Sequence, residues 1–155
     1  MFRTTKHHKP AHLLIATATV FGFGMTTAMA APAVSVTNPW FRYLLPSIPA
    51  GGYMTLSNAT GKPVVMTGAH SSACGMTMLH KSVTRDGVDQ MLPVKSITIP
   101  AHSSFTFRPG RYHVMCMHPH MKPGETVPVE LMFDGLPPVT AQFTVYGAAG
   151  KPAGK

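Results

Sequence analysis

The segments GMTMLH (residues 75–80) and RYHVMCM (residues 111–117) have the two-residue periodicity of β-strands. Successive side chains of a strand point to opposite faces, so residues two apart share a face. Side chains with nitrogen or sulfur donor atoms therefore gather on one face of each strand: Met76, Met78 and His80 on the first, and His113, Met115 and Met117 on the second. The pattern predicts two strands that each carry imidazole and thioether groups on a single face.

The rest of the chain after residue 30 is also divided into short apolar or alternating segments by turn residues. The further predicted strands are residues 34–36, 52–56, 63–69, 96–99, 104–108, 127–133 and 139–146. No segment keeps apolar residues at helical spacing over ten or more positions. Short strands at this spacing predict an all-β domain, an antiparallel sandwich or Greek-key barrel of eight or nine strands.

The N-terminus has the features of a secretory signal peptide. Basic residues at positions 3, 6 and 9 precede an apolar run over residues 13–25, which is followed by Ala28-Met29-Ala30. A membrane anchor is the alternative, but the apolar run is shorter than the roughly 20 residues of a spanning helix. We therefore expect a signal peptide over residues 1–30, an exported domain over 31–147 without stable membrane insertion, and a flexible tail over 148–155.

The composition argues against several classes of enzyme. The chain has 12 Met and 9 His but only five acidic residues, and many hydrolases and phosphotransferases depend on carboxylates. It contains no G-x-S-x-G elbow and no glycine-rich phosphate loop. The basic residues are scattered, so no nucleic-acid surface is expected. The sequence thus predicts a binding protein, not an enzyme.

Four donor residues form a candidate metal site: His80, Met91, His113 and Met115. Thioethers are soft neutral donors that favour Cu(I), and imidazole binds copper in either oxidation state. Four neutral ligands leave only the single charge of Cu(I), which an apolar pocket tolerates better than a dication. The alternative is that each Met fills the core and each His is structural, as in a secreted β-sandwich interaction domain without metal.

The same residues carry a resemblance to the PCuAC family of periplasmic copper chaperones. Gaps of ten, twenty-one and one residues separate His80, Met91, His113 and Met115, and this spacing is the signature of that family. The flanking segments are MLH (78–80), MLPV (91–94), IPA (99–101) and PGRYHVM (109–115), and the similarity extends from NPW (38–40) to the turn at 123–124. Two features depart from the family: Lys81 and Ser82 follow His80 where many relatives have a Met, and residues 147–155 contain no His or Met.

The resemblance implies a cupredoxin-like β-barrel that binds Cu(I) near its surface in the periplasm. It also implies a partner that accepts the copper, such as a cytochrome oxidase subunit or another copper chaperone, and we expect the carrier to be a monomer. His118, His120 and Met121 lie a few residues after the signature. They form either an auxiliary site, for Cu(II) or for copper in transit, or a solvated turn.

The two cysteines, Cys74 and Cys116, most simply form one disulfide in an exported protein. Such a bond would clamp the two donor-bearing strands together. If the thiols are free, Cys116 and the histidines after it resemble the ligand loop of a blue-copper electron-transfer protein. Only Met117 separates Cys116 from His118, however, which is shorter than the usual spacing of that loop.

Overall fold

The computed structural model describes Met1, Phe2 and residues 32–150. The signal peptide expected over residues 1–30 therefore lies outside the described residues except for its first two, as does the last part of the expected tail, residues 151–155. The part of the chain that the structure describes contains no helix with the length and apolar character needed to cross a membrane.

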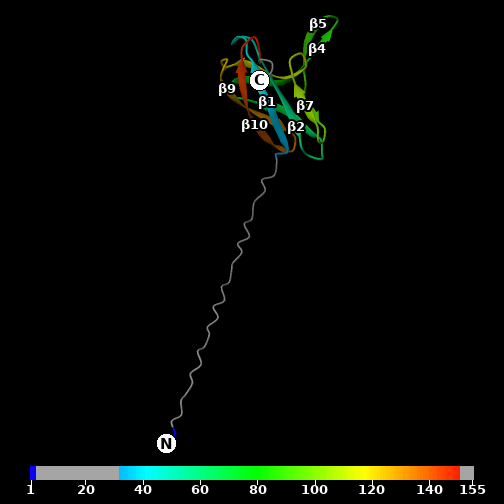
Figure 1. The fold of residues 1–155 in the computed structure, drawn as a ribbon. Coiled ribbons are helices and arrows are strands. Elements are labelled where there is room, and N and C mark those ends of the chain that lie inside the picture. Colours follow the sequence, from blue (N-terminus) through cyan, green and yellow to red (C-terminus); the bar gives the residue numbers. More distant parts are fainter. Residues whose placement is uncertain (3–31, 151–155) are drawn as a thin grey trace. The chain divides into compact units, whose positions relative to one another are not determined.

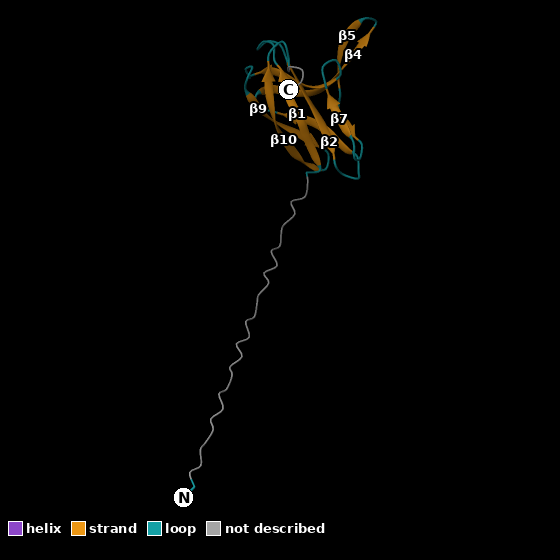
Figure 2. Cartoon of the chain, viewed as in Figure 1, coloured by secondary structure: helices purple, strands orange, loops and turns teal. Residues whose placement is uncertain are grey.

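The described residues form ten β-strands (Figures 1 and 2). They are β1 (Val34–Arg42), β2 (Ala50–Asn58), β3 (Val64–His70), β4 (Cys74–Arg85), β5 (Val88–Pro93), β6 (Ile97–Ile99), β7 (Ser104–Phe107), β8 (Tyr112–Pro119), β9 (Thr126–Phe133) and β10 (Leu136–Tyr146). The all-β fold class expected from the sequence is confirmed. The strand number is ten, not eight or nine, because β5 is an additional strand.

Hydrogen bonds join all ten strands into one sheet. The order of the strands is β5-β4-β8-β2-β1-β10-β9-β3-β6, and β7 pairs with β2 beside this path. β1 and β10 run parallel, with Trp40 opposite Thr144, and the other pairs are antiparallel. β3 and β4 are far apart in this order, yet the Thr77 hydroxyl of β4 donates a hydrogen bond to the Ala69 carbonyl of β3. The sheet therefore folds back on itself around an enclosed core.

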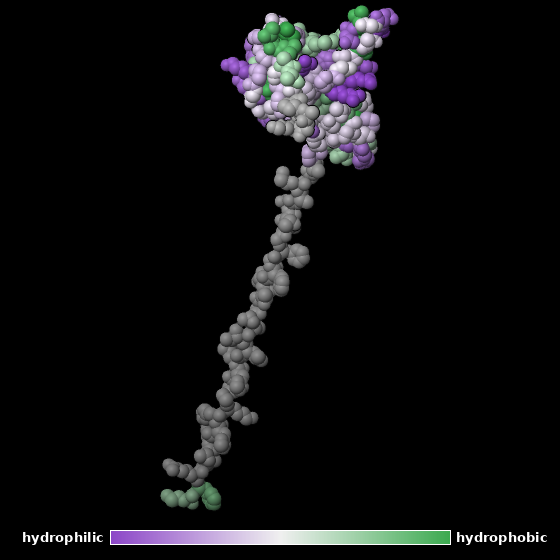
Figure 3. Space-filling model, turned by 45° about the horizontal axis from the view of Figure 1, so that its top comes forward, coloured by the Kyte–Doolittle hydropathy of each residue, from purple (hydrophilic) through white to green (hydrophobic). Residues whose placement is uncertain are grey.

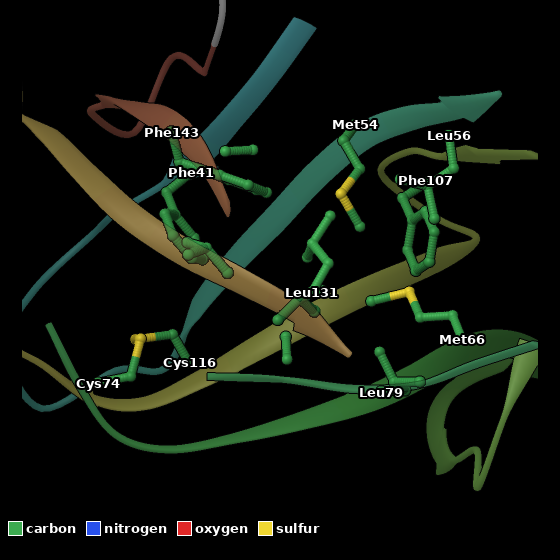
Figure 4. Close-up of a cluster of buried hydrophobic side chains, with 14 of the residues drawn as sticks. Phe41, Met54, Leu56, Met66, Cys74, Leu79, Phe107, Cys116, Leu131 and Phe143 are labelled. Carbon is green, nitrogen blue, oxygen red and sulfur yellow. A yellow bond between two sulfur atoms is a disulfide. The ribbon is translucent and has the colours of Figure 1, made fainter. Parts of the chain in front are cut away.

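The core follows from the alternation of side chains along the strands. In β9 the buried residues are Val127, Val129, Leu131 and Phe133, and every residue between them is exposed. Figure 4 shows Met54, Met66 and Leu131 among the buried side chains of the core. Met54 and Met66 are 2% and 0% exposed. These two methionines therefore serve as core residues, while others lie on the surface and are available for another role.

The strand β5 forms a hairpin with β4 that extends away from the other strands (Figure 1). Asp86 and Gly87 connect the two strands, and both have positive φ angles, 52° and 74°. Positive φ at both central residues is the geometry of the two-residue turn that best fits the twist of a hairpin. All six residues of β5 are exposed. Met91 therefore lies on a strand, in a part of the chain where the sequence predicts none.

Candidate metal centre

Two histidines face each other across β4 and β8. His80 and His113 are register partners in this antiparallel pair. Their ring centroids lie 5.8 Å apart with the ring planes close to perpendicular. Directly opposed residues share a face of the sheet, so both imidazoles lie on the same side of this ribbon. The structure therefore brings together the two imidazoles that the sequence selected.

His113 is buried and oriented. Its side chain is 5% exposed, and its Nδ1–H donates a hydrogen bond of 3.3 Å to the Arg111 carbonyl oxygen. A hydrogen bond at Nδ1 leaves the Nε2 lone pair available as a ligand. Burial lowers the pKa of His113, the charge of nearby His80 lowers it further, and the bond to Arg111 opposes both effects. The net effect lowers the pKa and so favours the neutral ring, which is the form that binds metals.

His80 has an unsatisfied nitrogen. Its Nδ1 is buried and has no hydrogen-bond partner, and burial lowers the pKa of this imidazole as well. A buried polar atom without a partner is costly, because it has lost its hydrogen bonds to water without replacement. A metal ion is one partner that would satisfy this nitrogen. His80 is thus a second candidate donor, and burial favours the neutral form of its ring.

Thioethers continue the same face toward the C-terminal end of β8. Met115 lies two residues after His113, and Met78 lies opposite Met115 in the register of β4 and β8. Both methionines are half-buried. Met78 was placed on this face by its spacing but was not included among the candidate ligands. Its pairing with Met115 depends on the register of the two strands, which the sequence does not reveal.

Met91 lies at the outer edge of the centre. It is opposite Ser82 in the β4–β5 hairpin and is 59% exposed. A pocket of about 300 Å³ is lined by three of the four predicted ligands, Met91, His113 and Met115. His80 does not line this pocket and is linked to the group through its ring contact with His113. We call His80, Met91, His113 and Met115 the His/Met centre. The assignment of these four as ligands stays a prediction.

Other residues at the pocket had no signal in the sequence. Tyr53 of β2 and Arg42 of β1 line it, and the Tyr53 ring lies 6.4 Å from the His113 ring. Burial raises the pKa of Tyr53, and the charge of Arg42 opposes this effect. They reach the site because β2 pairs with β8 along Ala50–Gly52. No local pattern of the sequence predicts this pairing.

The surface around the pocket is partly apolar. Exposed apolar residues include Leu44, Leu45 and Ile48 from the segment between β1 and β2, and Val88 and Leu92 from β5. In the surface view the end of the β4–β5 hairpin carries both hydrophobic and hydrophilic atoms (Figure 3). Leu44 itself lines the pocket. The centre therefore opens onto a surface of mixed polarity.

The expected auxiliary residues are in different surroundings. His118 and His120 are exposed, and His118 has a positive φ of 48°. Met121 is 4% exposed and belongs to the hydrophobic core, where it also lines a small pocket with His120. Two imidazoles of this group are thus at the surface while the thioether is mostly enclosed.

The structure joins Cys74 and Cys116 in a disulfide with a Cα–Cα distance of 5.3 Å. Both residues are buried, and the bond appears in Figure 4 beneath the aromatic core residues Phe41 and Phe143. It connects the start of β4 to β8, the two strands that carry the histidines. The blue-copper alternative required a free Cys116 thiolate as ligand, and neither cysteine is free. That alternative therefore lacks its defining ligand.

The donor set is soft and neutral. Among the described residues no group of three or more His, Cys, Asp or Glu is arranged to hold a metal ion. The His/Met centre contains two imidazoles, and its remaining donors are thioethers. Thioether sulfur selects soft ions such as Cu(I) and binds hard cations poorly.

A family model described as "Putative lipoprotein LpqE-like" matches residues 34–145. A curated relative, the putative lipoprotein Lxx21020 of Leifsonia xyli subsp. xyli (strain CTCB07), is 31% identical over 116 residues. The match covers 70% of this chain and 66% of the relative, so the chain spans slightly less than two thirds of that protein.

Solved structures share the fold. The copper-bound PCuAC domain from PmoF2 is 22% identical, with a TM-score of 0.63, over 77% of this chain and 97% of that domain. Apo-DR1885 from Deinococcus radiodurans is 28% identical, with a TM-score of 0.57, over 92% and 97% of the two chains. The CuI-DR1885 structure is 27% identical, with a TM-score of 0.54, over 79% and 83%. These similarities confirm the predicted resemblance to PCuAC proteins and the predicted cupredoxin-like fold.

Proposed function

The chain belongs to the LpqE-like family, and on this premise we propose that it is a copper carrier that binds Cu(I) in the His/Met centre. The single observation that supports this function most strongly is the direct pairing of His80 with His113, next to the pairing of Met78 with Met115. This arrangement places two neutral imidazoles and thioether sulfur on one face, which is the donor chemistry that Cu(I) prefers. Two of the similar structures, the PCuAC domain from PmoF2 and CuI-DR1885, are copper-bound forms of those proteins.

The proposed mechanism is carriage and ligand exchange. Met91 and the surface around it leave one side of the centre open, since Met91 is 59% exposed. A donor atom of an acceptor protein can approach from that side and replace the ligands of this chain one at a time. Each tenfold difference in affinity between carrier and acceptor corresponds to about 1.4 kcal/mol, so small differences set the direction of transfer. No bond of a substrate is made or broken, so the protein is proposed to be a carrier and not an enzyme.

The proposed location is the periplasm, and the proposed partner is a copper acceptor such as a cytochrome oxidase subunit or another copper chaperone. The predicted signal peptide over residues 1–30 supports export. The word lipoprotein in the names of the family and of the curated relative agrees with a place in the cell envelope. A disulfide between buried cysteines fits an oxidising compartment.

A competition titration with a chromophoric Cu(I) chelator under anaerobic conditions tests the function. We expect His113→Ala and Met115→Ala each to weaken the tightest Cu(I) site by at least about tenfold, since each removes a ligand. His70→Ala and Met132→Leu are matched controls, because both side chains are exposed and lie outside the centre. Wild-type affinity in both ligand variants would contradict the His/Met centre, and a wild-type protein that binds no Cu(I) would favour a metal-free interaction domain.

A further inference from the structure

Two additional methionines continue the row of donors beyond the His/Met centre. In the register of β4 and β8, Met76 lies opposite Met117, and the pair Met78–Met115 separates them from the histidines. Donor side chains thus follow each other in pairs along one face of this ribbon. The pair Met76–Met117 is not part of the proposed copper centre.

The exposure of these methionines argues against a packing role. Met76 is 51% exposed, and Met78 and Met117 are half-buried, whereas the core residues Met54 and Met66 are at most 2% exposed. The residues between them on each strand, such as Leu79 and Cys116, turn to the core. Apolar side chains that stay partly exposed gain less from burial than core residues do, so packing alone does not explain thioethers at these successive positions.

The spacing of the ribbon provides room for a second ion. Directly opposed residues have Cβ atoms about 4.5–5.5 Å apart, which lets two flexible thioethers converge on one ion. Positions two apart along a strand are separated by roughly 6.6 Å, so the pair Met76–Met117 lies about 13 Å along the ribbon from His80 and His113. One ion at each end would therefore have its own ligands.

We propose that Met76, Met78 and Met117 form a second site, specific for soft monovalent cations such as Cu(I). The site consists of neutral thioethers without imidazole, so it selects soft ions and rejects hard ones. It binds more weakly than the His/Met centre, because its donors are flexible side chains at partly exposed positions and must be ordered when the ion binds. Met78 lies between the two sites and belongs to the second one when both are filled. This inference goes beyond the proposed function, since it requires no transfer to an acceptor.

Silver provides a direct test, because Ag(I) has the charge and softness of Cu(I) but does not change its oxidation state under these conditions. The full chain, labelled with ¹³C at the methionine methyl groups, is titrated with Ag(I) and followed by NMR, with methyl signals assigned from single Met→Leu variants. We expect the first equivalent to shift Met91 and Met115, and a second, weaker equivalent to shift Met76 and Met117. A wild-type titration that ends after one equivalent would overturn the second site.

The variant Met76→Leu with Met117→Leu should lose the second equivalent and keep the first. Leucine conserves most of the apolar volume, so the fold is expected to remain intact, which circular dichroism checks. The control is Met132→Leu, an exposed methionine of β9 that should leave both equivalents unchanged. A second equivalent that survives in the double variant would also overturn the inference.

The histidine variant His80→Gln with His113→Gln separates this inference from the proposed function. We expect this variant to lose the first equivalent and to retain the weaker one at Met76 and Met117. Loss of both would show that the thioethers bind only as an extension of the histidines, which would contradict a separate site. Retention of both would contradict the His/Met centre and leave the thioether site supported.

Discussion

At the scale of single residues, His113 is constrained more strongly than the other predicted ligands. It is 5% exposed, its Nδ1 is bound to the Arg111 carbonyl, and its ring lies near the rings of His80 and Tyr53. A ring held in one orientation loses little freedom when a metal binds. His113 is therefore the most constrained of the four predicted ligands, and Met91 is the most exposed of them.

The lowered pKa of His113 predicts a pH dependence of the apoprotein. The folded pKa lies below the ordinary value of 6.5, so the unfolded chain binds more protons between these two values. The free energy of unfolding should therefore fall as the pH decreases below about 6.5, with a limit of about 1.4 kcal/mol per pH unit for one proton. Urea unfolding of metal-free protein between pH 5 and 8 measures this slope. His113→Gln should make the free energy of unfolding less dependent on pH. An unchanged slope in that variant would show that His113 is not the group responsible for the pH dependence.

Gly52 shows how a small residue permits close packing beneath the site. A Cβ at this position would lie 2.7 Å from a ring carbon of Phe41, which is fully buried and packs against Phe143. Gly52→Ala should lower the free energy of unfolding by about 1–3 kcal/mol, because the ring has no free space into which to move. Gly61→Ala is the matched control, since the nearest atom to its new Cβ is 3.8 Å away. Equal effects of the two changes in urea unfolding would refute this explanation.

At the scale of elements, the β4–β5 hairpin carries Met91 at the outer edge of the centre. Met91 lies on the outer strand of this hairpin, which is exposed along its length. Met91→Leu should leave the fold stable and should speed release of Cu(I) about tenfold or more, because an exposed ligand contributes to binding but little to packing. Stopped-flow transfer to a chelator measures the rate, with Met132→Leu as control. A release rate equal to that of the wild type would show that Met91 is not a ligand.

The strands show what local sequence patterns reveal and what they miss. β9 was predictable because its apolar residues alternate strictly, which follows from one buried and one exposed face. β5 was missed because all its residues are exposed, so no face of it is marked by apolar side chains. The Asp86-Gly87 dipeptide was the one local indication of this hairpin, since Asp-Gly between two strand segments favours a two-residue turn.

The candidate ligands were predictable from spacing, but their neighbours were not. Residue pairs such as His113 and Met115 share a face by the periodicity of a single strand. The partners Met78–Met115 and Met76–Met117 depend on how β4 and β8 are aligned, and Tyr53 depends on the pairing of β2 with β8. The register and order of the strands depend on contacts between distant parts of the chain. Local patterns in a single sequence do not reveal these contacts.

At the scale of the whole molecule, the donor face is built from distant parts of the chain. β4 and β8 are neighbours in the sheet, although β5, β6 and β7 lie between them in sequence. The outer side of this pair carries the donor side chains, and its inner side covers the core. The stability of the fold and the geometry of the site therefore depend on the same pair of strands.

The disulfide between Cys74 and Cys116 should make a large contribution to that shared stability. It closes a loop with a sequence separation of 42 residues, for which the loop-entropy model gives about 4 kcal/mol. Cys74→Ala with Cys116→Ala should thus shift the midpoint of urea unfolding to clearly lower concentration. The same variant tests the effect of the disulfide on copper binding, and it is preferable to the reduced wild type, because free thiolates would offer new ligands for copper.

Since the bond fixes β4 against β8 before the metal arrives, we expect the variant to bind Cu(I) more weakly even where it is fully folded. Unchanged stability and unchanged affinity together would show that strand pairing alone positions the two histidines.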